Sequence, residues 1–184
     1  MACERVTTWY LEQTNPAQLR RARVPDPAPL VMQARDPLPE FSRFLYTAVG
    51  GDWHWIDRLS WTYARWREYL ARPQVQTWVM YVEGTPAGYI ELEQQSESNV
   101  ELAYFGLIKS FIGRGLGGHL LTRGIEQAWA MNAKRVWVHT CALDGEHALA
   151  NYQARGMRLY NTETAEKEVG ITPGPWPGAY PQGA

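Results

Sequence analysis

Four glycines within six residues, Gly113, Gly115, Gly117 and Gly118, form the part of the sequence best suited to bind a ligand. They lie between an apolar run at 102–108 and a helical pattern at 116–131. A glycine loop that leads into a helix points backbone N–H groups at a ligand, and the positive end of the helix dipole favours an anion. Glycine also lets the backbone approach closely, because it has no side chain. We therefore expect this segment to bind a phosphate or pyrophosphate.

The same glycines allow two other interpretations. Gly113, Gly115 and Gly118 fit G-x-G-x-x-G, which would indicate an oxidoreductase that binds NAD(P). That fingerprint belongs in a first strand–helix–strand unit whose next strand ends in an acidic residue. Here three predicted strands precede the loop, and the next strand ends at Thr140 and Cys141. A glycine-rich turn without any ligand is the other alternative.

The elements that would position this loop follow from periodicity and turn residues. We expect strands at 6–12, 76–83, 88–94, 100–108, 135–141 and from 157–160, helices at 39–49, 62–70, 116–131 and 146–155, and an irregular connector at 20–39. The first strands form an antiparallel meander, and strand–helix–strand–helix–strand follows. This order predicts an α/β (α+β) fold, a mixed and mostly antiparallel central sheet with helices on both faces.

Length and composition favour one globular domain. The chain has 184 residues, of which 45% are hydrophobic and 20% charged, so we expect a single domain over 1–169. Residues 170–184 are rich in proline and glycine and are predicted to form a C-terminal tail. The formal net charge of −1 makes nucleic acid an unexpected partner.

The number of cysteines and the length of the apolar runs indicate the cellular compartment in which the protein is expected. Cys3 and Cys141 are the two cysteines, and their spacing matches no metal-binding pattern. The start of the chain lacks the basic and apolar regions of a signal peptide, and no apolar stretch is long enough to cross a bilayer. We therefore expect a cytoplasmic protein without a membrane partner and without a metal.

Two stretches resemble the GCN5-related N-acetyltransferase (GNAT) superfamily. The family signature [Q/R]-x-x-G-x-[G/A] is matched at Gly115 and Gly117, with Ile112 where Gln or Arg is usual. Residues 147–157 resemble the family's A-x-x-x-Y-x-x-x-G-F segment, with Met157 in place of Phe. Both stretches occur in the family's order and with ordinary spacing.

The resemblance covers about residues 76–160 well, and the part before it corresponds to the family's variable acceptor-binding region. Where many members have an Asn that contacts the cofactor, this chain has Gly145 beside Asp144. Both Gly145 and Ile112 depart from the family pattern. They give weight to an alternative, a catalytically silent acyl-CoA-binding or regulatory module on the same fold.

The resemblance implies direct transfer of an acetyl group from acetyl-CoA to a primary amine, without a metal. The pyrophosphate would bind at 114–119 and the pantetheine along 105–108, and a backbone N–H of Phe105 or Leu107 would bond the thioester oxygen. The cofactor-binding residues that it implies are Phe105, Gly106, Leu107, Ile108, Gly113, Arg114, Gly115, Leu116, Gly117, Gly118, His119 and Asn151.

The resemblance also supplies candidates for proton transfer. Tyr152 matches the tyrosine that protonates the departing thiolate, and a core aromatic is its alternative role. An acceptor amine with the pKa of a free lysine, about 10.4, must lose a proton before attack. Glu101 corresponds to the catalytic Glu of histone-acetylating members, and Glu91 on the neighbouring strand is the second candidate; a solvated carboxylate is the alternative for Glu101. Alternation along the strand predicts that Glu101, Ala103 and Phe105 share one face.

The end of the strand predicted at 135–141 offers a different nucleophile. His139, Thr140 and Cys141 lie there, and a cysteine beside a histidine can form an acyl-enzyme. Direct transfer needs no such intermediate, and a buried cysteine usually packs without reacting.

The acceptor is expected to bind against the helix pair at 39–70. Trp53 and Trp55 can stack on an aromatic or cationic molecule, and Asp57 can attract an ammonium group. Core packing is the alternative for at least two of the clustered tryptophans Trp53, Trp55, Trp61 and Trp66. A small amine, an amino acid, an aminoglycoside-like molecule or a protein amine would fit equally well. Because many relatives pair, a homodimer is a candidate assembly.

Overall fold

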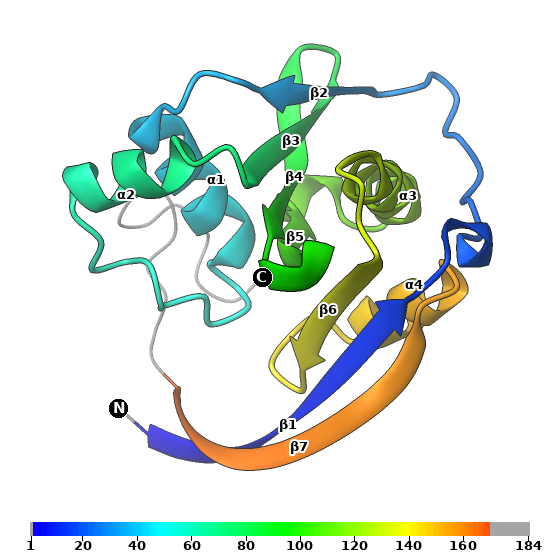
Figure 1. The fold of residues 1–184 in the computed structure, drawn as a ribbon. Coiled ribbons are helices and arrows are strands. Elements are labelled where there is room, and N and C mark those ends of the chain that lie inside the picture. Colours follow the sequence, from blue (N-terminus) through cyan, green and yellow to red (C-terminus); the bar gives the residue numbers. More distant parts are fainter. Residues whose placement is uncertain (1, 170–184) are drawn as a thin grey trace.

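The computed structural model describes residues 2–169, and a seven-stranded sheet organises them (Figure 1). The strands are β1 (Ala2–Gln13), β2 (Leu30–Ala34), β3 (Val75–Val82), β4 (Thr85–Gln94), β5 (Asn99–Leu107), β6 (Arg135–Cys141) and β7 (Arg158–Val169). Their order across the sheet is β2-β3-β4-β5-β6-β1-β7. Only the β5–β6 pairing among them is parallel, so the mixed, mostly antiparallel sheet expected from the sequence is confirmed.

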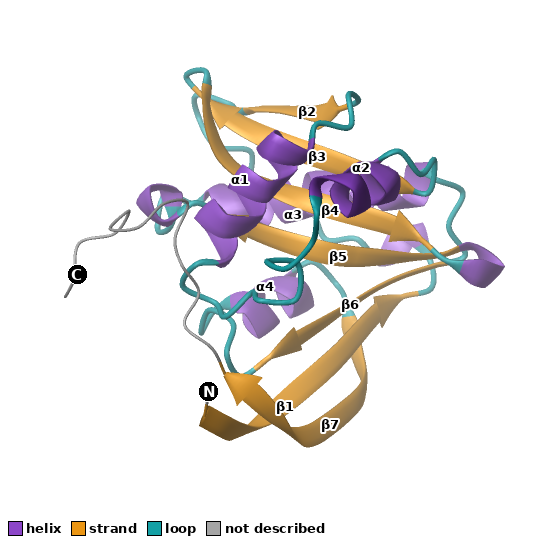
Figure 2. Cartoon of the chain, turned by 90° about the vertical axis from the view of Figure 1, so that its left-hand side faces the viewer, coloured by secondary structure: helices purple, strands orange, loops and turns teal. Residues whose placement is uncertain are grey.

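Within residues 2–169, four α-helices cover both faces of this sheet, as predicted. They are α1 (Pro39–Gly50), α2 (Tyr63–Leu70), α3 (Leu116–Ala130) and α4 (Ala148–Ala154), with short 3₁₀ turns at Pro16–Gln18, Ser96–Ser98 and Lys109–Phe111. Figure 2 shows α1 and α2 in front of the central strands and α3 and α4 behind them. The glycine loop leads directly into α3.

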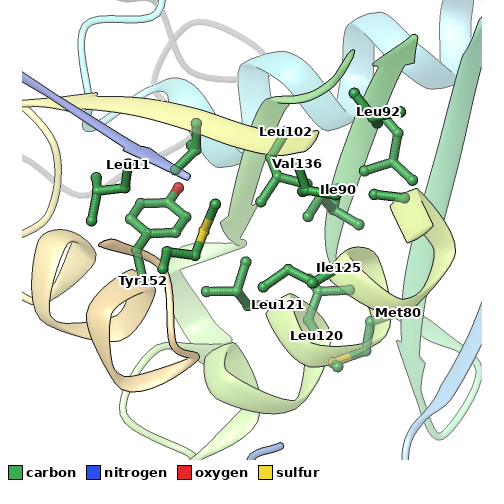
Figure 3. Close-up of a cluster of buried hydrophobic side chains, with 14 of the residues drawn as sticks. Leu11, Met80, Ile90, Leu92, Leu102, Leu120, Leu121, Ile125, Val136 and Tyr152 are labelled. Carbon is green, nitrogen blue, oxygen red and sulfur yellow. The ribbon is translucent and has the colours of Figure 1, made fainter. Parts of the chain in front are cut away.

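The main core lies between the sheet and the two helices α3 and α4 (Figure 3). Leu116, Leu120, Ile125 and Ala128, which have the spacing of one helix face, are all buried there. A second, smaller core joins α1 to the opposite face through Leu45, Val49, Val79 and Tyr89. The sheet is therefore apolar on both faces over its central strands, which holds them rigidly between two helical layers.

The parallel pairing of β5 with β6 is short. It extends only from Asn99 opposite Arg135 to Glu101 opposite Trp137, although β5 continues to Leu107 and β6 to Cys141. Beyond Glu101 the two strands diverge, as Figure 2 shows. This divergence opens the sheet at the carboxyl ends of both strands.

One segment differs from the expectation, and a second continues beyond the residues for which a strand was expected. Residues 20–39 were predicted to be irregular, yet they contain β2, which pairs with β3 in an antiparallel register. The final strand continues to Val169 because β7 pairs with β1 along almost its whole length. In both cases tertiary pairing determines the structure, since the local sequence lacks an apolar alternation. The predicted tail at 170–184 lies outside the described residues.

The prediction that Glu101, Ala103 and Phe105 share one face is wrong. Leu92 pairs with Leu102 and Glu91 with Tyr104, which leaves Ala103 as an extra residue in β5. Such a bulge reverses the alternation beyond it. Phe105 consequently packs against the main core on the α3 side, as Leu102 does.

Candidate functional site

A cleft of about 630 Å³ lies where β5 and β6 diverge. Four parts of the chain line it: the loop at 53–57, residues 102–107 of β5, the end of β6 with the turn that follows it, and residues between 148 and 152 of α4. Ile112 and Gly117 extend it to the glycine loop, and Lys167 of β7 completes it. The divergence of two strands thus provides a site that reaches from the loop before α2 to the start of α3.

The β5 backbone presents N–H groups to this opening. The Ile108 N–H donates to the carbonyl of Ala87 at 2.9 Å. Hydrogen-bonded pairs alternate along an antiparallel ladder, and the register then makes Tyr89 with Gly106 the next such pair. Phe105 and Leu107 occupy the intervening positions, so their N–H groups point away from β4 and towards the side from which β6 has diverged.

The glycine loop is shaped for close approach to the start of α3. Gly113 and Gly115 have φ values of +82° and +74°, in the left-handed region that favours glycine. Gly115 is the N-cap of α3 and provides no capping side chain, so the first N–H groups of the helix keep their capacity to bind a ligand. A Cβ atom on Gly117 would lie 3.7 Å from the Asn151 side chain and 3.8 Å from that of Leu107. The helix start, β5 and α4 therefore converge at Gly117.

The residues predicted to bind the cofactor fall into two groups. Phe105, Gly106, Leu107, Gly117 and Asn151 line the cleft. The others are not among its lining residues and belong to the loop and to the first turn of α3: Ile108, Gly113, Arg114, Gly115, Leu116, Gly118 and His119. The two groups are continuous along the chain, so an elongated ligand could contact both.

Tyr152 reaches the cleft from α4. Its side chain is only 5% exposed and lies among the buried side chains of the main core (Figure 3). Its ring meets that of Phe105 edge-on at 5.9 Å between centroids. Burial, assisted by the negative charge of Asp144, raises the pKa of the Tyr152 hydroxyl above its ordinary value of 10.0. The hydroxyl therefore stays protonated at neutral pH and is available as a hydrogen-bond donor.

Glu91, the second predicted base, does not line the cleft. Its side chain is 2% exposed, and the carboxylate forms a two-pronged ion pair with Arg58 at 2.8 and 3.1 Å. The Tyr69 hydroxyl donates to the same carboxylate at 2.9 Å. Both oxygens are occupied by partners within the protein, so Glu91 has a structural role.

Glu101 is also absent from the cleft lining, but it contacts a residue that belongs to it. One carboxylate oxygen lies 3.1 Å from Nδ1 of His139, and the other accepts a hydrogen bond from the Gln95 side chain at 2.7 Å. His139 itself lines the cleft. The carboxylate predicted from sequence is thus linked to the cleft through an imidazole.

The acceptor-side residues Trp53, Trp55 and Asp57 all line the cleft. Trp55 also packs edge-on against Tyr104, at 4.9 Å between ring centroids, so it is part of the wall as well. Trp66 is 2% exposed and lies within 5.1 Å of the ring of Trp61. Packing therefore accounts for at least two of the four tryptophans, as the alternative interpretation expected.

Sequence reasoning missed several lining residues. Lys167 comes from β7, at a position without a local motif. His147, the N-cap of α4, begins the segment at 147–157 but was not among the predicted site residues. Asp144 accepts hydrogen bonds from the Thr140 hydroxyl at 2.6 Å and the Cys141 N–H at 2.7 Å, which closes the turn after β6. Burial, followed by the charge of Asp144, raises the pKa of Cys141, which disfavours a thiolate nucleophile.

Two absences concern the part of the chain that the structure describes. Within residues 2–169 no group of three His, Cys, Asp or Glu side chains is arranged to hold a metal ion. No helix in the same range has the length and apolar character needed to cross a membrane.

Comparison with known proteins identifies relatives of this fold. A model of the acetyltransferase (GNAT) family matches residues 39–157. The structure of a GCN5-related N-acetyltransferase from Sphaerobacter thermophilus is similar, with a TM-score of 0.67, 18% identity and 94% of this chain covered. Another, from Kribbella flavida, has a TM-score of 0.62, 17% identity and 90% of this chain covered. The chain spans 54% and 58% of the length of these two structures. A search of curated proteins found no match.

Proposed function

Since this chain belongs to the GNAT family of acetyltransferases, we propose that it moves an acetyl group from acetyl-CoA directly to a primary amine. The observation that carries the proposal is the cleft between β5 and β6. It combines N–H groups of β5, the hydroxyl of Tyr152 and the start of α3 along one continuous surface. These are the donors that a thioester and a pyrophosphate require.

The residues present fit the donor. The left-handed Gly113 and Gly115 expose backbone at the start of α3, where the pyrophosphate would bind. The N–H groups of Phe105 and Leu107 would hold the pantetheine arm and polarise the thioester oxygen, and Gly117 and Asn151 would flank the arm. When bound, the donor supplies an activated acetyl group. Ile112 lies at the cleft edge with its side chain 47% exposed, and it has no polar group to offer the pyrophosphate. Backbone N–H groups would therefore supply the contacts to the pyrophosphate.

Tyr152 is proposed to protonate the sulfur as the carbon–sulfur bond breaks. Its hydroxyl lies in a buried setting that keeps it neutral, and its ring is fixed against Phe105 of β5. A general acid must be protonated before the reaction and must be held close to the leaving atom. Position and protonation state both support this role.

The acceptor is proposed to enter beside Trp53, Trp55 and Asp57. The aromatic rings provide apolar walls that a cation can also approach, and the exposed Asp57 carboxylate attracts an ammonium group. Small amines, amino acids, aminoglycoside-like molecules and protein amines all remain acceptors to be tested.

Binding measurements come first. Calorimetry with acetyl-CoA, CoA and NADPH tests the donor, and tight acetyl-CoA binding without NADPH binding is expected. Thiol release is then measured with tryptamine, L-lysine, kanamycin and a lysine-containing peptide as acceptors. Binding without thiol release from any of them would instead favour the silent acyl-CoA-binding module. Failure to bind acetyl-CoA would overturn the proposed function.

We further propose a cytoplasmic protein in which residues 1–169 form one domain, with 39–70 as its acceptor-side helix pair, and which pairs as a homodimer. Light scattering coupled to gel filtration measures the assembly, and a monomeric mass would overturn the last point.

A further inference from the structure

The geometry points to His139 as the base that removes the proton from the acceptor amine, with Glu101 as the residue that positions it. This inference rests on the proposed function. The observation behind it is the 3.1 Å contact between Nδ1 of His139 and a carboxylate oxygen of Glu101, at the edge of the cleft.

The contact fixes which nitrogen of His139 can act. A carboxylate accepts hydrogen bonds and cannot donate them, so Nδ1 of the imidazole is the donor in this pair. The Nε2 atom, on the opposite edge of the ring, then carries the lone pair. A histidine whose one nitrogen is held by a carboxylate while the other remains available is the arrangement that general bases use.

Glu101 is itself held in place. Its second oxygen accepts from the Gln95 amide at 2.7 Å, and the carbonyl oxygen of that amide accepts from the indole N–H of Trp137 at 3.1 Å. The side chain of Glu101 is 13% exposed, whereas that of His139 is 47% exposed. The chain of contacts therefore starts in a shielded position and ends at an accessible imidazole.

Neighbouring groups complete the setting of His139. The ring of Tyr10 on β1 lies 6.2 Å from the imidazole and that of Trp137 lies 6.1 Å from it, so the imidazole is bordered by aromatic surfaces. The Tyr10 hydroxyl donates to Glu163 of β7. Glu101 is the only carboxylate with a contact to the imidazole among the described residues.

Three neighbouring titratable groups of the cleft, Asp144, Lys167 and His147, are less suited to this step. The Asp144 carboxylate is engaged by Thr140 and by the backbone of Cys141. Lys167 is a cation whose ammonium group donates to Thr8. The side chain of His147 is 88% exposed and its ion-pair partner, the adjacent Glu146, is 86% exposed, so neither is held in one orientation.

The proton balance is complete with groups that the protein provides. Nε2 of His139 takes one proton from the ammonium and later passes it to solvent. The amine lone pair forms the bond to carbon, and the electron pair of the carbon–sulfur bond goes to sulfur. Tyr152 gives its proton to that sulfur and is reprotonated by the second proton that the nitrogen loses. The net products are the amide, the thiol and one proton.

The test uses His139→Gln, Glu101→Gln and the double variant, assayed with the panel amine that gives the fastest thiol release. His139→Gln is expected to lower kcat by about 10²–10⁴-fold, the usual contribution of a general base. Glu101→Gln is expected to lower kcat less. The loss from Glu101→Gln should disappear in the His139→Gln background, because a positioning residue acts only through its partner.

The pH profile separates this chemistry from a structural effect. Wild-type kcat/KM should fall on the acid side as the imidazole becomes charged, and His139→Gln should remove that limb. Acetyl-CoA affinity should be unchanged in each variant, which also reports that it is folded. Glu12→Gln is the matched control. It removes the carboxylate that pairs with Arg135, which lies on the same strand as His139 but outside the cleft, and it should keep both kcat and the pH profile.

The outcomes distinguish the two proposals. If His139→Gln releases thiol as fast as the wild type, or keeps the acid limb of the pH profile, the role of His139 is overturned. The proposed acetyl transfer would still stand. Additive losses in the double variant overturn the role of Glu101 as its positioning residue. No thiol release by the wild type with any panel amine removes the proposed transfer, and this inference with it.

Discussion

The guanidinium of Arg58 and the carboxylate of Glu91 meet at 2.8 Å in the interior, where their side chains are 7% and 2% exposed. The guanidinium carbon also lies 4.3 Å from the ring centroids of both Tyr69 and Tyr104. Arg58 directly follows the 53–57 loop that lines the cleft. The pair therefore attaches that loop to β4, and it explains why Glu91 is unavailable as a base.

Breaking this pair should cost stability. Glu91→Leu leaves the Arg58 guanidinium buried without a counter-charge, which typically lowers the free energy of unfolding by about 3–5 kcal/mol. Urea unfolding measures the change. Arg72→Gln, which removes a more exposed partner of Glu93, is the control and should cost less than about 1 kcal/mol. Equal losses in both variants would contradict the assignment.

Tyr152→Phe should reduce turnover and leave acetyl-CoA affinity intact. The substitution keeps the ring that packs against Phe105 and removes only the hydroxyl. Loss of a general acid lowers kcat by about 10²–10⁴-fold. Steady-state kinetics with calorimetry on the same sample separates the two effects. Unchanged kcat would assign Tyr152 to the core alone.

Gly117→Ala should separate ligand binding from stability. Its Cβ atom meets only ordinary contacts, and alanine in a helix is more stable than glycine by up to about 1 kcal/mol. The same atom projects between Asn151 and Leu107, into the cleft, so acetyl-CoA should bind more weakly. Gln127→Ala lies near the other end of α3 and outside the cleft, and it should leave acetyl-CoA affinity unchanged. Affinity unchanged in Gly117→Ala would place the donor elsewhere.

Stability should fall steeply above pH 10. Burial is the first cause of the raised pKa values of Tyr46, Tyr69, Tyr89, Tyr104 and Tyr152, each above the ordinary 10.0. Above pH 10 the unfolded chain loses these protons while the folded chain keeps them. The unfolded state then binds fewer protons, so the free energy of unfolding decreases as pH rises.

Urea midpoints measured at neutral pH and above pH 10, together with tyrosinate absorbance, test this. The absorbance change that these five tyrosines contribute should accompany unfolding. Tyrosinate formation at most of these five in the folded state would contradict the burial argument.

The fold was predictable where a local pattern coincided with tertiary packing. The stripe Leu116, Leu120, Ile125 and Ala128 indicated α3 because the side that it defines is the side that is buried. By contrast, β2 is flanked by prolines and exposes Leu30 and Met32, so nothing in its own sequence indicates a strand. Its pairing with β3 determines its conformation.

The candidate site was predictable only in part, for a similar reason. Tyr152 and Gly117 lie within sequence motifs, and both line the cleft. The relation between Glu101 and His139 joins residues 38 positions apart, and it depends on the parallel register of two strands. Neither residue type nor spacing encodes that register. The sequence therefore indicated the carboxylate, and it indicated His139 only as a neighbour of Cys141, not as the partner of Glu101.

The bulge at Ala103 divides β5 into two halves whose side chains alternate in opposite phase along the sequence. Before it, Leu102 packs towards α3; after it, Tyr104 turns towards α1 while Phe105 meets Tyr152. A strand of the same length without this bulge would place every side chain that follows on the opposite side, since strand alternation has a period of two. The aromatic that now faces α4 would then face α1. The bulge at this one position therefore determines which side chains the second half of β5 presents to each helical layer.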